Sequence, residues 1–403
     1  MREYLVVFLV AAVVTWLLGV LARELAMRVG AVARVRDRDV HAVPTPYFGG
    51  VAMLGGLVAA YLVARQLPFL SLASDTVFRD AAVVLLAGGL VCLFGVFDDV
   101  LELDALTKLG GQVLAAGLLV LFGVQYYVLP LPGGAQLSLD EGQAAILTIL
   151  LVVASVNAVN FVDGLDGLAA GVVGFGAVGF FAFSYVLAAL SGESRAITAA
   201  VLCSALAGAC AGFLPHNFFP ARMFMGDSGS MLLGLVLSAS TLTLTGQFVL
   251  FDLSQGALGQ ASFLPLVIPV LLPLAVMLIP FVDLVLAVVR RLRAGRSPFA
   301  PDKQHLHHRM LMLGHSHRRA VLILYLWAAL LAEVLVVASL FSGRVVAVTV
   351  AISTLLVLAA TFVLPRVNRP GAVTSWEELD RTQPREDSPG QSGSPEPTAG
   401  EIS

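Results

Sequence analysis

Eleven long apolar segments constrain the fold of this 403-residue chain more than any other feature. A helix needs about 20 mainly apolar residues to cross a bilayer, and in lipid only helices or closed barrels satisfy their backbone polar groups. A barrel would show alternating apolar and polar residues instead of solid apolar runs. We therefore predict an all-α polytopic integral membrane protein with about 11 transmembrane helices, at 4–21, 47–66, 81–97, 109–128, 143–161, 168–190, 196–214, 230–249, 263–289, 320–341 and 345–364.

Composition agrees with membrane residence. Only 13% of the residues are charged and 58% are apolar, whereas a soluble chain carries about 25% charged residues. The 24 basic and 27 acidic residues give a net charge of −3, which excludes a basic nucleic-acid binder, so we expect no nucleic-acid partner. The three cysteines all lie within apolar runs, which favours small hydrophobic side chains over disulfides.

The distribution of basic residues predicts the orientation. With the N-terminus outside, 19 of the 24 basic residues fall on the inner side and five on the outer side, as the positive-inside rule requires. The C-terminus is then cytoplasmic. We expect residues 1–365 to form the membrane domain, and 366–403, which is rich in Pro, Ser, Gly and Glu, to be a disordered cytoplasmic tail.

One motif in the sequence is misleading. Gly174, Gly176 and Gly179 spell G-x-G-x-x-G, but a dinucleotide site needs this motif between a strand and a helix. Here it lies within a predicted span, so we expect these glycines to permit close helix packing, as we also expect of Gly208 and Gly212.

Carboxylates gather at the predicted inner ends of the spans. The first cluster, DDVLELDALTK, places Asp98 and Asp99 at the end of one span and Lys108 at the start of the next. A solvated helix end is the bland interpretation. A bound cation or a phosphate-bearing substrate explains better why like charges stand side by side.

The second cluster, NAVNFVDGLDGLAAG, is the most specific. Asn157, Asn160 and Asp163 recur every third residue and share one sector of a helix, while Gly164 and Gly167 predict that the helix ends before Asp166. Amides and carboxylates are hard oxygen ligands suited to Mg²⁺ or Mn²⁺. A purely structural role would bury these polar groups at a cost of several kcal/mol.

Two further motifs complete the candidate site. FMGDSGS places Asp227 where the eighth helix opens, as a metal ligand or only as a helix cap. PDKQHLHHR lies in the most basic inner loop, and we expect its side chains to bind a phosphate or a sugar hydroxyl, since no cysteine lies close enough for a usual zinc site. These residues are Lys303, His305, His307, His308 and Arg309.

These four segments, with HAVPTPYFGG before them as a fifth, resemble the polyprenyl-phosphate N-acetylhexosamine-1-phosphate transferase family, which includes the MraY, WecA and TagO enzymes. HLHHR is more similar to the WecA/TagO branch. The resemblance implies transfer of N-acetylglucosamine-1-phosphate from UDP-N-acetylglucosamine to a polyprenyl phosphate (undecaprenyl or decaprenyl), with release of UMP. It also implies a bacterial plasma-membrane location, an active site on the cytoplasmic face and Mg²⁺ (or Mn²⁺) as cofactor.

The same resemblance implies residue roles. Asp227 would bind the metal with Asn160 as a second ligand, and Asp98 would deprotonate or orient the lipid phosphate. Asp99, Asp163 and Asp166 would complete the catalytic group by supporting metal and nucleotide. Contacts with nucleotide, sugar or diphosphate are implied for Lys108, Asn157, Lys303, His305, His307, His308 and Arg309. Asp39 and Tyr47 stand where the family often has cations, so we assign no phosphate-binding role there.

Three alternatives remain open at this stage. A phospho-N-acetylmuramoyl-pentapeptide transferase, or an enzyme with another UDP-N-acetylhexosamine donor, would share most of these motifs. A transporter would place its polar residues near the bilayer midplane, whereas 10 of the 20 acids before the tail lie in predicted cytoplasmic loops and few lie within a span. We expect the two substrates and the bilayer as partners, and we leave open a homodimer.

Overall fold

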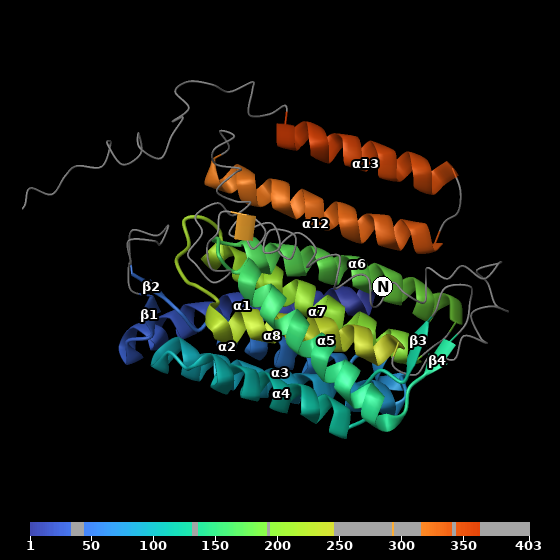
Figure 1. Cartoon of the computed structure of the whole chain (residues 1–403), viewed down its shortest axis with the longest axis horizontal. Helices are drawn as coiled ribbons and strands as arrows, with labels where there is room; N and C mark the ends of the chain where they lie inside the picture. The colour runs from blue at the N-terminus through green and yellow to red at the C-terminus, as the bar shows by residue number, and fades with distance from the viewer. Residues whose placement is uncertain are drawn as a thin grey trace, which may run out of the picture.

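The computed structural model describes residues 1–33, 44–130, 136–191, 194–245, 292–293, 316–340 and 344–362. Helices dominate these ranges, and most of them lie side by side in one bundle (Figure 1). Their bounds are α1 Arg2–Val29, α2 Gly49–Ala64, α3 Asp75–Leu101, α4 Ala105–Leu121, α5 Glu141–Val162, α6 Leu168–Ser191, α7 Ser194–Asn217, α8 Gly226–Thr245, α12 His317–Leu340 and α13 Arg344–Phe362, with a short 3₁₀ turn at Leu70–Leu72.

The predicted spans agree with these helices. Ten of the eleven coincide with a described helix, and the ninth, 263–289, lies outside the described residues. Among the described helices seven are long and apolar enough to cross a membrane, and α2 and α4 are shorter apolar helices. The chain is therefore a helical polytopic membrane protein by length and composition. The count of 11, the orientation and the boundary at residue 365 stay predictions.

Two short antiparallel ribbons correct the strictly all-α prediction. Val32–Ala33 (β1) pairs with Thr45–Pro46 (β2), and Val128–Pro130 (β3) pairs with Gln136–Ser138 (β4). The two ribbons lie at opposite ends of the bundle (Figure 1). They join segments at helix ends, where backbone groups need partners that no helix supplies.

Helix α4 differs from its predicted span, 109–128. It begins four residues earlier because the side chain of Asp104 caps it, accepting hydrogen bonds from the backbone N–H groups of Leu106 and Thr107 at 2.9 and 3.0 Å. It ends at Leu121 because Gly123 adopts a left-handed backbone conformation, with φ +82°. Hydropathy locates a span, whereas capping side chains decide its ends.

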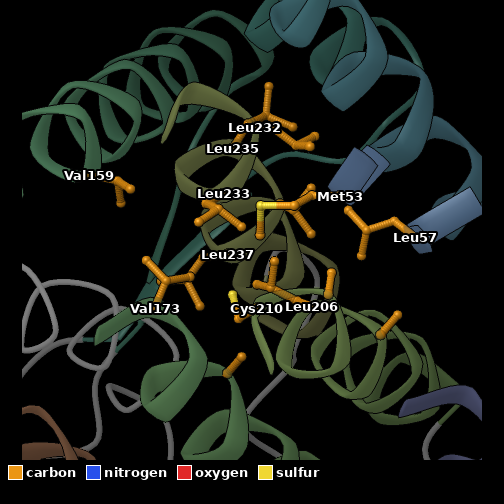
Figure 2. Packing of buried hydrophobic residues seen from close by; sticks show 14 of the residues in the cluster. Met53, Leu57, Val159, Val173, Leu206, Cys210, Leu232, Leu233, Leu235 and Leu237 are labelled. Carbon is orange, nitrogen blue, oxygen red and sulfur yellow. The ribbon is translucent and has the colours of Figure 1, made fainter. Parts of the chain in front are cut away.

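Helix α8 lies at the centre of the bundle, and 94% of its most apolar window is buried. Leucines on α8 pack against Met53 and Leu57 of α2, Val159 of α5 and Leu206 of α7 (Figure 2). Towards the C-terminal end of α8 the hydroxyls of Ser240 and Thr243 are satisfied locally, since they donate to carbonyls three or four residues earlier. A helix of modest hydropathy is therefore stable in the interior.

Small residues bring α1 and α7 together, as predicted for Gly208 and Gly212. A Cβ at Gly208 would lie 2.2 Å from the carbonyl oxygen of Phe8, and a Cβ at Gly212 would lie 2.1 Å from that of Ala12. Neither position tolerates a side chain without separating the helices. On the other side of the bundle α12 packs on α6 and α13 packs on α12, so these helices form further layers (Figure 1).

The close α1–α7 contact makes a stability prediction. We expect Gly212→Ala to lower the free energy of unfolding by about 1–3 kcal/mol, because overpacking forces backbone shifts of that cost. Thermal unfolding of the purified protein in detergent measures the change. Gly117→Ala is the matched control, since a Cβ at Gly117 meets nothing within 4 Å. Equal melting temperatures for the two variants would contradict the contact.

Candidate active site

Four helix ends meet at one end of the bundle, on the side of the β1–β2 ribbon. The last turns of α3 and α5 and the first turns of α4 and α8 come together there, as an alternating up-and-down path requires. The loop from Phe219 to Met225 joins this end to the ribbon, since the N–H of Phe224 donates to the carbonyl of Pro46 at 2.9 Å. Three of the predicted motifs therefore come together in the described structure.

Lys108 bridges two carboxylates from different helices. Its Nζ lies 2.5 Å from Oδ2 of Asp98 and 3.0 Å from Oδ2 of Asp227. Asp98 is buried, and its other oxygen accepts the backbone N–H of Leu103 at 2.8 Å. Lys108 keeps a third of its side chain exposed, so one face of this bridge is open. The bridge fixes the separation of the Asp98 and Asp227 carboxylates.

Asn160 holds the other oxygen of Asp227. Its Nδ2 donates to Oδ1 of Asp227 and to the hydroxyl of Ser230, both at 2.9 Å. The amide nitrogen, not the amide oxygen, therefore faces Asp227 in this arrangement. Asn160 meets the predicted metal-binding residue directly, while its own role as a metal ligand stays a prediction.

Asp99 turns away from its neighbour Asp98. Its Oδ1 accepts the backbone N–H of Asp227 at 2.7 Å, and its Oδ2 accepts the hydroxyl of Ser228 at 2.8 Å and the N–H of Ser228 at 3.3 Å. Gly226, with φ +69°, allows this approach, because a Cβ there would lie 2.3 Å from Oδ2 of Asp99. Asp99 thus contacts the backbone that carries Asp227.

Asp163 and Asp166 flank the break between α5 and α6. The helix ends at Val162, and Gly167 has φ +80°, as the glycines predicted. Asp163 caps α5, and its pKa is raised well above the usual range by burial and then by the charges of Asp227, Asp99 and Asp166. Asp166 accepts the N–H of Ala221 at 2.9 Å and so anchors the loop that leads to Asp227.

Asn157 faces a different neighbour from Asn160. Its Nδ2 donates to Oε1 of Gln112 on α4 at 2.6 Å and to the carbonyl of Val153 at 2.8 Å. Gln112 is buried, and its Nε2 lies 3.5 Å from Sδ of Met231. Gln112 is not among the predicted site residues, although its place one helical turn after Lys108 on α4 was a usable signal. Ser228 and Ser230 stand in the FMGDSGS motif without a predicted role. Asn217 was not predicted either, and its Oδ1 accepts the N–H of Gly167 at 3.0 Å.

The remaining predicted site residues lie outside the described part of the chain. These are Lys303, His305, His307, His308 and Arg309. Tyr47, to which we assigned no phosphate-binding role, lies in the described part: its N–H donates to the carbonyl of Ala31 at 3.0 Å and its ring lies 6.3 Å from that of Phe224. Tyr47 therefore packs against the loop that carries Asp227.

The amino-acid sequence of this chain is similar to those of known proteins. Residues 81–245, which hold Asp98, Lys108, Asn160 and Asp227, match the family described as glycosyl transferase family 4. A decaprenyl-phosphate N-acetylglucosaminephosphotransferase of Mycolicibacterium smegmatis is 46% identical over 336 residues, 82% of this chain and 81% of the relative. The chain therefore belongs to glycosyl transferase family 4.

More distant relatives extend the family across bacteria. A probable undecaprenyl-phosphate N-acetylglucosaminyl 1-phosphate transferase of Bacillus subtilis is 31% identical, over 81% of this chain and 82% of the relative. An undecaprenyl-phosphate α-N-acetylglucosaminyl 1-phosphate transferase of Escherichia coli K12 is 29% identical, over 79% of each chain. The resemblance predicted from the motifs, including its WecA/TagO-like branch, is confirmed.

Proposed function

We propose that this protein transfers N-acetylglucosamine-1-phosphate from UDP-N-acetylglucosamine to a polyprenyl phosphate and releases UMP. The observation that carries the proposal is the bridge of Lys108 between Asp98 and Asp227, together with the hydrogen bond that Asn160 donates to Asp227. It unites the helix ends of three family motifs in one site. The activities for which these relatives are named indicate the sugar phosphate and the class of lipid.

The reaction assigns a role to each of these side chains. A non-bridging oxygen of the lipid phosphate attacks the β-phosphorus of the nucleotide sugar, the β-phosphorus–oxygen bond to the α-phosphate breaks, and that oxygen leaves with UMP. Asp98 orients the lipid phosphate and accepts its proton. Lys108 holds Asp98 in place and offsets charge that builds on the diphosphate. Such transfer depends mainly on positioning and charge stabilisation.

The donor chemistry of the site fits Mg²⁺ or Mn²⁺. The predicted motifs contribute five carboxylates to this end of the bundle, and Lys108 contacts two of them, Asp98 and Asp227. The others are Asp99, Asp163 and Asp166. Within the described ranges no three His, Cys, Asp or Glu side chains form a complete metal-binding group. Mg²⁺ does not require one, because it is usually held by one or two carboxylates, substrate phosphates and water. Asp227 would hold the ion, which when bound neutralises the diphosphate as a Lewis acid.

The proposal places this chemistry on the cytoplasmic face of a bacterial plasma membrane. The site lies at the ends of helices that are long and apolar enough to cross a membrane, so a soluble nucleotide sugar and the headgroup of a lipid would reach the same carboxylates. The positive-inside distribution, 19 basic residues against five, supports the cytoplasmic side. The homodimer stays a prediction.

One assay tests the proposal. Purified protein is mixed with Mg²⁺, polyprenyl phosphate and one labelled nucleotide sugar at a time: UDP-N-acetylglucosamine, UDP-N-acetylgalactosamine or UDP-N-acetylmuramoyl-pentapeptide. We expect UMP and a lipid-linked product with UDP-N-acetylglucosamine, and loss of both after EDTA. A lipid product formed only from the pentapeptide substrate would instead support the muramoyl-pentapeptide alternative. No lipid product with any donor would refute a transferase and favour the transporter.

A further inference from the structure

Helix α8 begins without a capping side chain of its own. Its first helical residue is Gly226, so Met225 occupies the capping position, and the carbonyl of Met225 accepts the N–H of Gly229 at 3.2 Å, as expected there. A good capping residue accepts hydrogen bonds from the N–H groups two and three places on, here those of Asp227 and Ser228. The thioether of methionine is a poor acceptor.

Asp99 supplies the missing acceptor from another helix. Its two carboxylate oxygens take both of these N–H groups and the Ser228 hydroxyl. Its negative charge also lies at the positive end of the α8 dipole. Three donors leave Asp99 little accepting capacity for a substrate.

Two glycines make this capping in trans possible. Gly95 lies one helical turn before Asp99 on α3, and a Cβ there would lie 2.3 Å from Cα of Ser228. Gly226 clears the space beside the Asp99 carboxylate in the same way. The backbones of α3 and α8 therefore approach closely at this point, and the direction of the Asp227 side chain depends on the contact.

We infer that Asp99 is a positioning residue that caps α8 in trans and aims Asp227, and that it takes no direct part in the reaction. The inference rests on the proposed function for its link to metal use. It separates two adjacent carboxylates that the sequence could not distinguish: Asp98 faces Lys108, and Asp99 faces the α8 backbone.

Asp99→Asn tests the inference, because an amide of the same shape accepts with only one of its two terminal atoms. We expect backbone amides in a peptide spanning 224–232 to exchange with deuterium about fivefold faster. We expect the Mg²⁺ concentration for half-maximal activity to rise about tenfold or more, with kcat largely recovered at saturating Mg²⁺. A purely structural defect would lower kcat at every Mg²⁺ concentration and leave the half-maximal concentration unchanged.

Two further variants sharpen the result. Asp140→Asn changes the N-terminal cap of α5, at the end of α5 that lies away from Asn160. This variant should leave deuterium exchange at 224–232 and the Mg²⁺ dependence of activity unchanged. Ser228→Ala should weaken metal use in the native background but add nothing to Asp99→Asn, since the hydroxyl acts through Asp99.

The outcomes distinguish the inference from the proposed function. Unchanged exchange at 224–232, or a raised KM for UDP-N-acetylglucosamine at unchanged metal dependence, would overturn the positioning role. If Asp99→Asn exchanged faster at 224–232 but the wild-type protein transferred no sugar phosphate, capping of α8 by Asp99 would be supported and only the proposed reaction would be refuted.

Discussion

Asp227→Asn should abolish turnover, with activity falling by about 10³-fold, since a metal that neutralises transferring phosphate supplies several kcal/mol. Asp227 accepts Lys108 with one oxygen and Asn160 with the other, so the site is organised around its carboxylate. The asparagine keeps the shape but loses the charge that attracts a divalent cation. Turnover is measured as UMP release, and Mn²⁺ binding by electron paramagnetic resonance without substrates.

The control for this variant is Asp140→Asn, a carboxylate-to-amide change at a helix cap away from the site. Thermal unfolding of both variants checks that Asp227→Asn still folds. Near-normal activity of a folded Asp227→Asn protein would exclude Asp227 as the essential metal-binding carboxylate. Lost activity with undiminished Mn²⁺ binding would place the metal elsewhere.

Lys108→Met should lower kcat by about 100-fold, because truncating one partner of a close charge pair typically costs 2–5 kcal/mol, and partial exposure of Lys108 puts this pair at the lower end. The variant leaves the Asp98 and Asp227 carboxylates facing each other without a shared cation. We also expect the Mg²⁺ concentration for half-maximal activity to fall, since the added negative charge attracts Mg²⁺ and frees Oδ2 of Asp227. Asp99→Asn should move it in the opposite direction.

Lys108→Arg is the matched control for charge. One ammonium nitrogen reaches both carboxylates at 2.5 and 3.0 Å, a geometry that a planar guanidinium does not reproduce. We expect this variant to retain the native Mg²⁺ dependence with kcat about tenfold below the wild type. If Lys108→Met matched the wild type in kcat, the bridge would have no part in the reaction.

These experiments separate roles that the motifs could only group. Family resemblance placed four acids together as catalytic: Asp98, Asp99, Asp163 and Asp166. The structure gives three of them different partners, a lysine for Asp98, the start of α8 for Asp99 and a loop N–H for Asp166. Consecutive residues on a helix point about 100° apart, so neighbours in a motif reach different helices.

The apolar runs by themselves determined most of the fold of this protein. Segments of about 20 apolar residues have only helices as stable solutions in lipid, so ten predicted spans coincide with described helices. The break between α5 and α6 was equally readable, since Gly167, directly before α6, is of the residue type that adopts a left-handed conformation most easily. Both features depend on residues close in sequence.

Only the tertiary structure decided which side chains meet. Asn157 and Asn160 share a helix sector, yet the first pairs with Gln112 on α4 and the second with Asp227 on α8. Asp99 caps a helix that begins 127 positions later. Such pairings depend on how the helices pack, here on glycines that let the α3 and α8 backbones touch. Hydropathy and motif spacing carry no information about that packing, so the sequence located the acids at the helix ends and packing set what each one binds.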